Sequence, residues 1–442
     1  MLFKYCIILA ICSFALPIFG SISSGPMLGY SLHRESLVWL QTEKATEVQI
    51  HYRKQNSDED FSKSNIIQTK KEKAFVAKFV LTHLEPGTTY EYFITLDRKK
   101  VKREKPYQLK TQALWQYRTD PPDFSVAMGS CVFINEKQYD RPGKSYGGDY
   151  QIFESIHAKS PDMMLWLGDN VYLREVDFHG QQSIYHRYTH TRKTPEMQKL
   201  LASANHYAIW DDHDFGPNNS DRYYIHKDKT LDAFELFWGN PTTGLPDVKG
   251  GNFTQFQYND VDFFLMDNRY FRDGNDVKKK DKSYFGEKQI DWLITALKNS
   301  RAPFKIIASG GQILNETKVF ENYANYEEER KYLLKQIKKN KIEGVIFLSG
   351  DRHHTVITKL KRGKSHYPLY EITASPLTSK AYSPMKKELK KNALKETVNG
   401  NRNFVTMSFS GKKKDRSVMI RTFDVDGKEV WKFRIHEKEL KK

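Results

Sequence analysis

The chain places a carboxylate and a phenol three residues apart, directly after a short apolar run. That run, Met163–Leu167, stops at Gly168, and Asp169 and Tyr172 follow it. Five apolar residues ended by a glycine are typical of a buried strand, because a helix needs more length. Side chains just past such a strand lie where α/β folds bind ligands, and carboxylate and phenol oxygens are hard donors for a cation. In the alternative interpretation, Asp169 only caps the turn and Tyr172 only packs.

The other apolar runs in the second half of the chain end in a similar way. We predict further strands at Phe124–Met128, His206–Trp210, Val261–Met266, Phe304–Ala308 and Val345–Leu348. Candidate ligands follow nearly all of these strands, namely Cys131, Asp169, Asp212, Asp267 and Asp351. Burying several carboxylates at the edge of one sheet is prohibitive unless cations compensate their charge. A purely structural explanation needs as many unrelated turn caps, so the pattern indicates a metal centre.

Helical patterns lie between these strands and complete the second domain. Helices are predicted at Tyr150–Lys159, Glu287–Asn299 and Tyr326–Asn340. Further strands at Tyr367–Thr373 and Phe404–Phe409 precede a hairpin about Asp426-Gly427. Strands interleaved with helices predict an α/β domain over residues 124–442.

The preceding region, residues 25–111, is predicted to be all-β. Its strands are Ser36–Leu40, Glu47–Tyr52, Ala74–Leu81 and Tyr90–Leu96. The segment Leu84–Tyr90, L-E-P-G-T-T-Y, resembles the corner of fibronectin type III sandwiches, where the tyrosine hydroxyl ties the corner to the backbone. An ordinary Pro-Gly turn is the alternative. We therefore expect a fibronectin-III-like sandwich without chemistry of its own, followed by a linker at residues 112–123.

Five short motifs occur in a fixed order along the second domain. They are Ser130-Cys131, Gly168-Asp169-x-x-Tyr172, Asp211-Asp212-His213-Asp214, Asp267-x-Arg269 and Gly350-Asp351-x-His353. Each is weak alone, but the ordered set resembles the PhoD family of secreted alkaline phosphatases and phosphodiesterases, distant relatives of the purple acid phosphatases. The resemblance implies an α/β metallophosphatase sandwich, with two central sheets flanked by helices, after an N-terminal all-β domain.

The resemblance also implies a centre of Fe3+ and Ca2+ that holds a phosphate ester. Carried over by position, the metal ligands are Cys131, Asp169, Tyr172, Asp211, Asp212, Asp351 and His353. Thiolate, phenolate and carboxylate are anions that suit a trivalent ion, and further oxygen ligands suit calcium. Which ligand binds which metal stays open.

Three more residues are expected to act on the substrate. His213, flanked by carboxylates, is the candidate general acid or phosphate contact, although a lone histidine more often packs at a surface. Arg269 is expected to grip a phosphate bidentately, where the alternative is a merely exposed arginine. Asn219 is a candidate for substrate binding.

The implied activity is hydrolysis of phosphate esters, in which a metal-activated hydroxide attacks phosphorus. One alternative is a phosphodiesterase or phospholipase-type enzyme that acts on lipid or polymer diesters. Another is a non-catalytic exported binding protein whose ions are structural. The sequence leaves the preference for monoesters or diesters open.

The first 20 residues are predicted to form a signal peptide, with Lys4 before an apolar stretch from Tyr5 to Phe19. Its removal takes away Cys6 and Cys12, so the mature protein keeps only Cys131 and forms no intramolecular disulfide. No later run reaches the length of a membrane span. We therefore expect a secreted or periplasmic protein without a membrane anchor, and a monomer.

The net charge of +17 and a pI of about 9.3 mark a basic protein. The basic runs lie between apolar segments at Lys70–Lys73, Lys278–Lys282, Lys386–Lys391 and Lys412–Arg416, and are expected to be solvated loops. No specific nucleic-acid-binding motif accompanies them. The charge therefore predicts only a weak attraction to anionic substrates.

Overall fold

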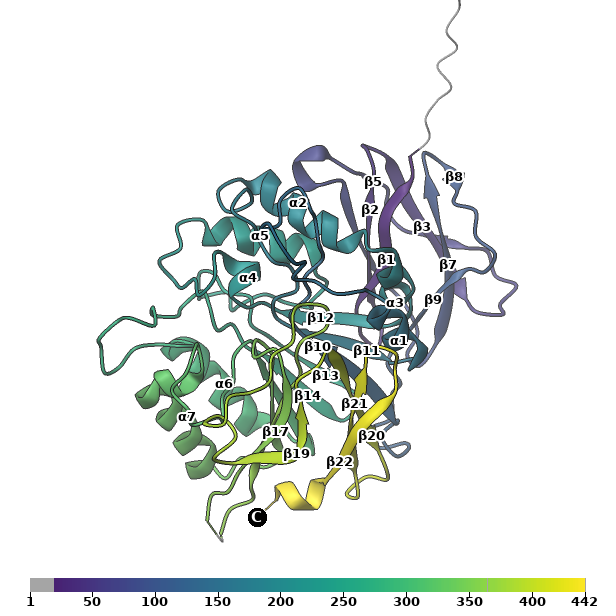
Figure 1. Ribbon diagram of the computed structural model, residues 1–442. Helices are drawn as coiled ribbons and strands as arrows, with labels where there is room; N and C mark the ends of the chain where they lie inside the picture. Colours follow the sequence, from purple (N-terminus) through teal and green to yellow (C-terminus); the bar gives the residue numbers. More distant parts are fainter. Residues whose placement is uncertain (1–19, 364, 442) are drawn as a thin grey trace, which may run out of the picture.

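The computed structural model describes residues 20–363 and 365–441. The predicted signal peptide, apart from Gly20, lies outside these residues. The described chain forms three β-sheets with helices packed around them (Figure 1). None of the helices within the described residues is both long and apolar enough to cross a bilayer.

The first sheet has nine strands in the order β22-β21-β20-β10-β11-β12-β1-β2-β6. Their bounds are β1 (Ile22–Ser31), β2 (Ser36–Thr42), β6 (Val76–Leu81), β10 (Phe124–Gly129), β11 (Met163–Leu167), β12 (Asn205–Ile209), β20 (Asn403–Ser410), β21 (Ser417–Asp424) and β22 (Glu429–His436). The three central strands β10, β11 and β12 run parallel, so their carboxyl ends meet at one edge.

The second sheet has seven strands in the order β13-β14-β15-β16-β18-β17-β19. Its strands are β13 (Thr254–Tyr258), β14 (Val261–Leu265), β15 (Phe304–Ser309), β16 (Val345–Ser349), β17 (Thr355–Leu360), β18 (Leu369–Thr373) and β19 (Ala393–Asn399). The two large sheets pack face to face. The Tyr207 ring of β12 stacks on Phe256 of β13 at 3.9 Å, and Phe304 of β15 meets Phe409 of β20 at 5.4 Å.

Helices flank these sheets, which confirms the predicted α/β sandwich. They are α1 (Ile152–Ala158), α2 (Gln181–Arg192), α3 (Gln198–Ser203), α4 (Asp212–Phe215), α5 (Lys227–Phe237), α6 (Glu287–Asn299) and α7 (Glu327–Lys339). Figure 1 shows α6 and α7 beside the second sheet and the other helices beside the first. Four single-turn 3-10 helices complete the set: Lys71–Lys73, Pro195–Met197, Tyr323–Asn325 and Glu437–Leu440.

The N-terminal region is a β-sandwich whose second layer is a separate small sheet. That layer is built on β3 (Glu47–Lys54) and β7 (Thr89–Leu96), joined by β4 (Ser62–Lys63), β5 (Ile67–Gln68), β8 (Lys99–Lys100) and β9 (Tyr107–Lys110). The predicted corner is present, because the Tyr90 hydroxyl accepts a hydrogen bond from the backbone N–H of Glu85 at 2.8 Å.

The other layer of the sandwich continues the nine-stranded sheet. Strand β1 pairs in parallel with β12, with Leu28 opposite Asn205, and then antiparallel with β2. The boundary predicted at residues 112–123 therefore separates two segments of sequence without separating two sheets.

Candidate metal centre

Strand ends of both large sheets place the candidate ligands at one point of the molecule. Cys131, Asp169 and Asp211 each lie two residues beyond β10, β11 and β12, and Asp351 lies two residues beyond β16 of the facing sheet. The sheets approach closely here. A Cβ atom on Gly350 would lie 2.5 Å from the carbonyl oxygen of Leu167, so only glycine fits without displacing backbone.

The backbone of these turns is unusual at several predicted ligands. The φ angles of Cys131, Asp169, Asp351 and His353 are 61°, 51°, 61° and 54°, in the left-handed region. Non-glycine residues pay about 1–3 kcal/mol each for such conformations, which persist mainly where function requires them. Positive φ thus supports these side chains as functional residues.

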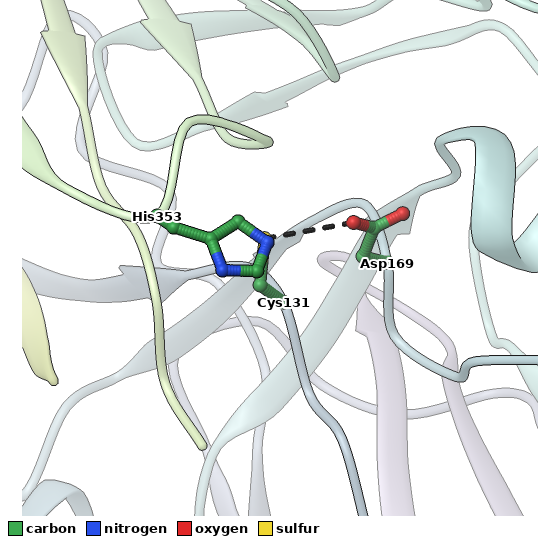
Figure 2. Close-up of side chains that lie close together, drawn as sticks. All are labelled: Cys131, Asp169 and His353. Carbon is green, nitrogen blue, oxygen red and sulfur yellow. Dashed lines mark hydrogen bonds between the residues drawn. The ribbon is translucent and has the colours of Figure 1, made fainter. Parts of the chain in front are cut away.

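A first group of possible ligand atoms comes from Cys131, Asp169 and His353. One ligand atom of each lies within 4.8 Å of the others, and the Cys131 Sγ is 3.6 Å from an Asp169 oxygen (Figure 2). The Tyr172 hydroxyl donates to the same Asp169 carboxylate at 3.1 Å and lies 3.4 Å from Nε2 of His353. Four predicted ligands therefore share one small space.

A second group combines Asp169 with Asp212 and His213, again with one atom of each within 4.8 Å. Asp169 belongs to both groups, so its two oxygens lie between two potential cation positions. The His213 ring packs against Tyr172 with centroids 4.2 Å apart and a tilt of 30°, and 22% of its side chain is exposed. His213 is thus the partly open member of an otherwise buried set.

Burial makes this donor set unstable in its charged form unless cations are present. It raises the pKa of the Cys131 thiol to about 12 and the pKa of Asp169 well above its ordinary range, where Asp212 adds to the effect. Burial also raises the pKa of Tyr172, with Asp169 contributing. The Oδ2 atom of Asp351 is buried and makes no hydrogen bond to any described residue. Anionic donors clustered in this way fit metal ions.

Asp212 differs, because neighbouring positive charges offset the cost of its burial. Burial opposes ionisation, but His213 and Arg269 together hold the pKa of Asp212 below its ordinary value. The backbone N–H of Asn219 also donates to Asp212 at 2.7 Å. The side chain of Asn219 is exposed beside this carboxylate. Asp212 is therefore anionic even before a cation binds.

Two of the buried aspartates are satisfied by hydrogen bonds, and a third is satisfied in part. Asp214 accepts from the backbone N–H groups of Asp211, Asn170 and Val171. Asp267 accepts from Trp210 Nε1 at 2.8 Å and from the N–H groups of Asn252, Arg269 and Tyr270. Asp211 forms a capping box with Asp214 and accepts from Asn268 at 2.8 Å, but its buried Oδ2 makes no hydrogen bond to any described residue. The turn-cap explanation thus accounts for Asp214 and Asp267. Asp211 lies outside both ligand groups, and its role as a ligand stays a prediction.

Arg269 lies in a buried ion network, and this location does not support the predicted phosphate contact. Its guanidinium is 0% exposed and pairs with Asp211 at 2.5 Å and with Glu321 at 2.7 Å. An Asp212 oxygen lies 3.6 Å away, and Arg272 pairs with Glu321 at 2.8 Å. With its donors turned to carboxylates, Arg269 serves to position the Asp211-Asp212 turn.

Sequence reasoning missed several residues of the centre. Ser130 and Ser375 lie 3.4 Å and 3.2 Å from the Cys131 sulfur, and the Ser375 hydroxyl donates to it. Glu321 holds the network around Arg269 from the segment between β15 and α7. Serines and a loop glutamate are too common to signal a site by themselves. Only the adjacency of Ser130 to Cys131 gave a local indication.

Comparisons with known proteins agree with this geometry. A family model described as PhoD-like phosphatase matches residues 127–414, and one described as a domain of unknown function (DUF7800) matches residues 20–114. No curated protein matches the chain. A solved structure described as PhoD has a TM-score of 0.74 at 17% identity, over 89% of this chain and 85% of that one. A purple acid phosphatase from yellow lupin (Lupinus luteus) seeds has a TM-score of 0.66 at 11% identity, over 93% and 74%. At these identities the two structures show the fold.

Proposed function

The chain belongs to the PhoD-like phosphatase family, and from this premise we propose that it is an alkaline phosphatase D type enzyme that uses Fe3+ and Ca2+. As a member of the family it is a phosphoric ester hydrolase with a metallophosphatase fold. The observation that carries the proposal is the position of Asp169 in both ligand groups, since one carboxylate can offer its two oxygens to neighbouring cations.

The two ligand groups suit different ions. Ferric iron is favoured by the anionic donors of the first group, which are the Cys131 thiolate, the Tyr172 phenolate and the Asp169 carboxylate. His353 lies beside these donors. Asp212 and Asp351 add carboxylate oxygens, which favour calcium. Among the described residues, the buried Oδ2 of Asp351 makes no hydrogen bond and has only Arg352 as an ion-pair partner, at 3.7 Å, which supports its assignment to a cation.

The remaining groups act on the ester itself. When bound, the cations neutralise phosphoryl oxygens and lower the pKa of coordinated water. His213 presents its partly exposed imidazole beside Asp212, with a nitrogen-to-oxygen separation of 4.0 Å, and is placed to pass a proton to the leaving oxygen. Burial lowers the pKa of His213, and the Asp212 carboxylate opposes that shift only in part. We assign the exposed Asn219 amide to substrate binding, as a donor to a phosphoryl oxygen.

Metal analysis beside a paired activity assay tests the proposal. The purified protein should contain iron and calcium and should hydrolyse an aryl phosphate monoester or the matching bis-aryl diester. The ratio of the two rates decides between the monoesterase and the alternative enzyme of lipid or polymer diesters. A metal-replete protein that hydrolyses neither ester would refute the proposed function.

We also propose that the enzyme is exported as a monomer. The support is the apolar segment after Lys4 and the small residues that follow it. N-terminal sequencing of the mature protein should begin near Ser21, and light scattering should return the mass of one chain. A mature protein that begins at Met1 contradicts export.

A further inference from the structure

A basic groove of about 580 Å³ lies at the opposite edge of the second sheet from the metal centre. Its lining includes Asp260 just before β14, Arg301 before β15 and Lys341 before β16, whereas the candidate ligands follow the strands. Strands of this length span about 16 Å, so the groove and the metal centre are separate sites. The hairpin between β20 and β21 closes one side with Lys413 and Lys414.

The groove carries far more positive than negative charge. Its cationic side chains are Lys298, Arg301, Lys305, Lys341, Lys413, Lys414, Arg416 and Lys441, against the carboxylates Asp260, Glu343 and Glu437. Asp260 already pairs with Arg416 at 2.9 Å, and Glu437 pairs with Lys441 at 2.8 Å. The pairing neutralises most of the negative charge inside the groove.

Several of the cations are left without a carboxylate. Arg416 and Lys305 are buried, and the Lys305 ammonium donates to the carbonyl of Ala302 at 2.7 Å. Lys305 forms no ion pair, and neither do the exposed cations Lys298, Arg301, Lys341, Lys413 and Lys414, as far as the described residues go. They come from α6, two strand-leading loops and a hairpin, so the fold gathers them from distant parts of the sequence.

Helix ends explain only part of this charge. Lys298 lies in the last turn of α6, where a cation stabilises the helix by about 0.3–1 kcal/mol. Arg301 and Lys341 lie beyond the ends of α6 and α7, and Lys413 and Lys414 belong to a hairpin. Like charges held together without a counter-ion repel one another. Binding of an anion in the groove relieves this repulsion and is therefore favourable.

We propose that this groove binds a flexible linear polyanion built of phosphate-type groups. Lysine ammonium groups are compact point charges on flexible stems, and they recognise charge density without a fixed geometry. A single small anion is instead held by bidentate arginine or backbone N–H groups, and Arg301 is the one unpaired arginine in the lining. Single-stranded nucleic acid needs aromatic platforms, whereas the lining contributes one aromatic residue, Trp115. The inference is independent of the proposed activity.

Binding of poly(vinylphosphonate) to the full chain tests this proposal. The polymer has P–C bonds, so an ester hydrolase does not cleave it during the measurement. The groove variant is Arg301→Gln/Lys341→Gln/Lys414→Gln, and the matched control is Lys70→Gln/Lys71→Gln/Lys102→Gln, which removes three exposed cations from the N-terminal sandwich. Fluorescence anisotropy is recorded over a salt series, with excess methylphosphonate and with oligothymidylate of equal charge as competitors.

The groove variant should bind the polymer about tenfold more weakly. The slope of log K against log salt should also fall by about two, because each of the three lost contacts releases about 0.7 counter-ions. The control should bind like the wild type, and turnover of a small ester should be equal in all three proteins. If the triple variant does not fold, Arg301→Gln and Lys414→Gln singly should each weaken binding. Equal binding by groove and control variants overturns the proposal, as does displacement by methylphosphonate or tighter binding of oligothymidylate.

Discussion

At the scale of single residues, Asp169 is the one side chain on which both ligand groups depend. Replacing one carboxylate oxygen with an amide nitrogen removes an anionic ligand without changing shape. Asp169→Asn should therefore abolish hydrolysis and lower the metal content of the purified protein, measured by elemental analysis and an ester assay.

The matched control for this substitution is Asp267→Asn. Asp267 is equally buried, but four N–H donors satisfy it and it faces no ligand group. Asp267→Asn should lower stability and leave the metal content unchanged. Near-normal turnover and metal content in Asp169→Asn would contradict the proposal that Asp169 offers its two oxygens to neighbouring cations.

Substitution of Cys131 tests whether this residue is a metal ligand or an ordinary core cysteine. Its sulfur is 0% exposed, and burial raises its thiol pKa to about 12, so only a cation keeps it as a thiolate. We expect a coloured protein, because Tyr172 as a phenolate on ferric iron gives charge transfer, as the resemblance to purple phosphatases implies. Cys131→Ala should lose the colour, the iron and most activity, as followed by visible absorption and iron analysis.

The contrary outcome for Cys131 is equally specific. A small core cysteine predicts a colourless protein in which Cys131→Ala costs only about 1 kcal/mol of stability. Titration of the thiol with and without denaturant, together with the iron content of the variant, distinguishes the cases. An active, iron-replete Cys131→Ala enzyme would contradict the assignment of Cys131 as a metal ligand.

At the scale of secondary-structure elements, Glu321 ties the segment between β15 and α7 to the end of β12. It does so through Arg269, which pairs with both Glu321 and Asp211, and Arg272 is a second buried partner of Glu321. Removing one partner of a buried ion network leaves an uncompensated charge and costs about 3–5 kcal/mol. Glu321→Gln should therefore lower the unfolding free energy by that order.

The same variant distinguishes positioning from mere stability. If Arg269 holds the turn of Asp211 and Asp212 in place, Glu321→Gln should also weaken calcium affinity at temperatures where the protein is folded. Glu327→Gln is the control, since Glu327 forms only exposed pairs with lysines 318 and 331. A Glu321→Gln enzyme with unchanged calcium affinity contradicts the positioning role.

His206 joins β12 to β11 and gives the sheet a pH dependence. It accepts from Trp166 Nε1 at 2.9 Å, and its other ring nitrogen lies 3.1 Å from the Leu200 carbonyl oxygen. Burial, with Arg192 adding to it, lowers the pKa of His206 from 6.5 to about 3. Between those values the unfolded chain binds a proton that the folded chain does not, so stability is lost as the pH falls through this window.

His206→Gln tests this dependence, because glutamine can make both hydrogen bonds without titrating. Proton uptake on unfolding near pH 5 should fall by about one in the variant, measured from the pH dependence of urea unfolding. Unchanged proton uptake would show that His206 is not the titrating group.

The elements that could be predicted from the sequence are those with a local pattern. The apolar run Met163–Leu167 and the helix Glu287–Asn299 have the predicted bounds. Helix α2 was not predicted, because it buries Arg187 and Arg192 in ion pairs and cation–π contacts and so lacks an apolar stripe. The order of the motifs predicted which strand ends carry chemistry. It did not predict which aspartates are caps, since that depends on N–H groups brought close only by folding.

At the scale of the whole molecule, the sandwich and the catalytic part share one sheet, and one face of β1 and β2 packs into the larger buried cluster, while the interior of the sandwich forms a cluster of its own. The Asn205 amide donates to the Gly29 carbonyl at 2.8 Å, and Trp39 Nε1 donates to Leu236 at 3.0 Å. Met27 and Trp39 belong to the same buried cluster as Trp166 and Phe237. Such long-range pairing is absent from local sequence patterns, so the sequence did not predict that β1 and β2 join the sheet of the second domain.

This shared sheet predicts that the chain unfolds as one unit. Ile50→Ala removes a fully buried side chain from the far layer of the sandwich, which should cost about 2–5 kcal/mol. Calorimetry should show a single transition whose midpoint falls in the variant, and the midpoint of heat inactivation of ester hydrolysis should fall by the same amount. The control is Val80→Ala, a half-exposed position on β6 of the same sandwich, for which little shift is expected. If the sandwich were an independent domain, Ile50→Ala would split the transition in two and hydrolysis would survive the first. That result would restore the boundary at residues 112–123 as a true linker, because the pairing of β1 with β12 would then contribute too little free energy to couple the two parts.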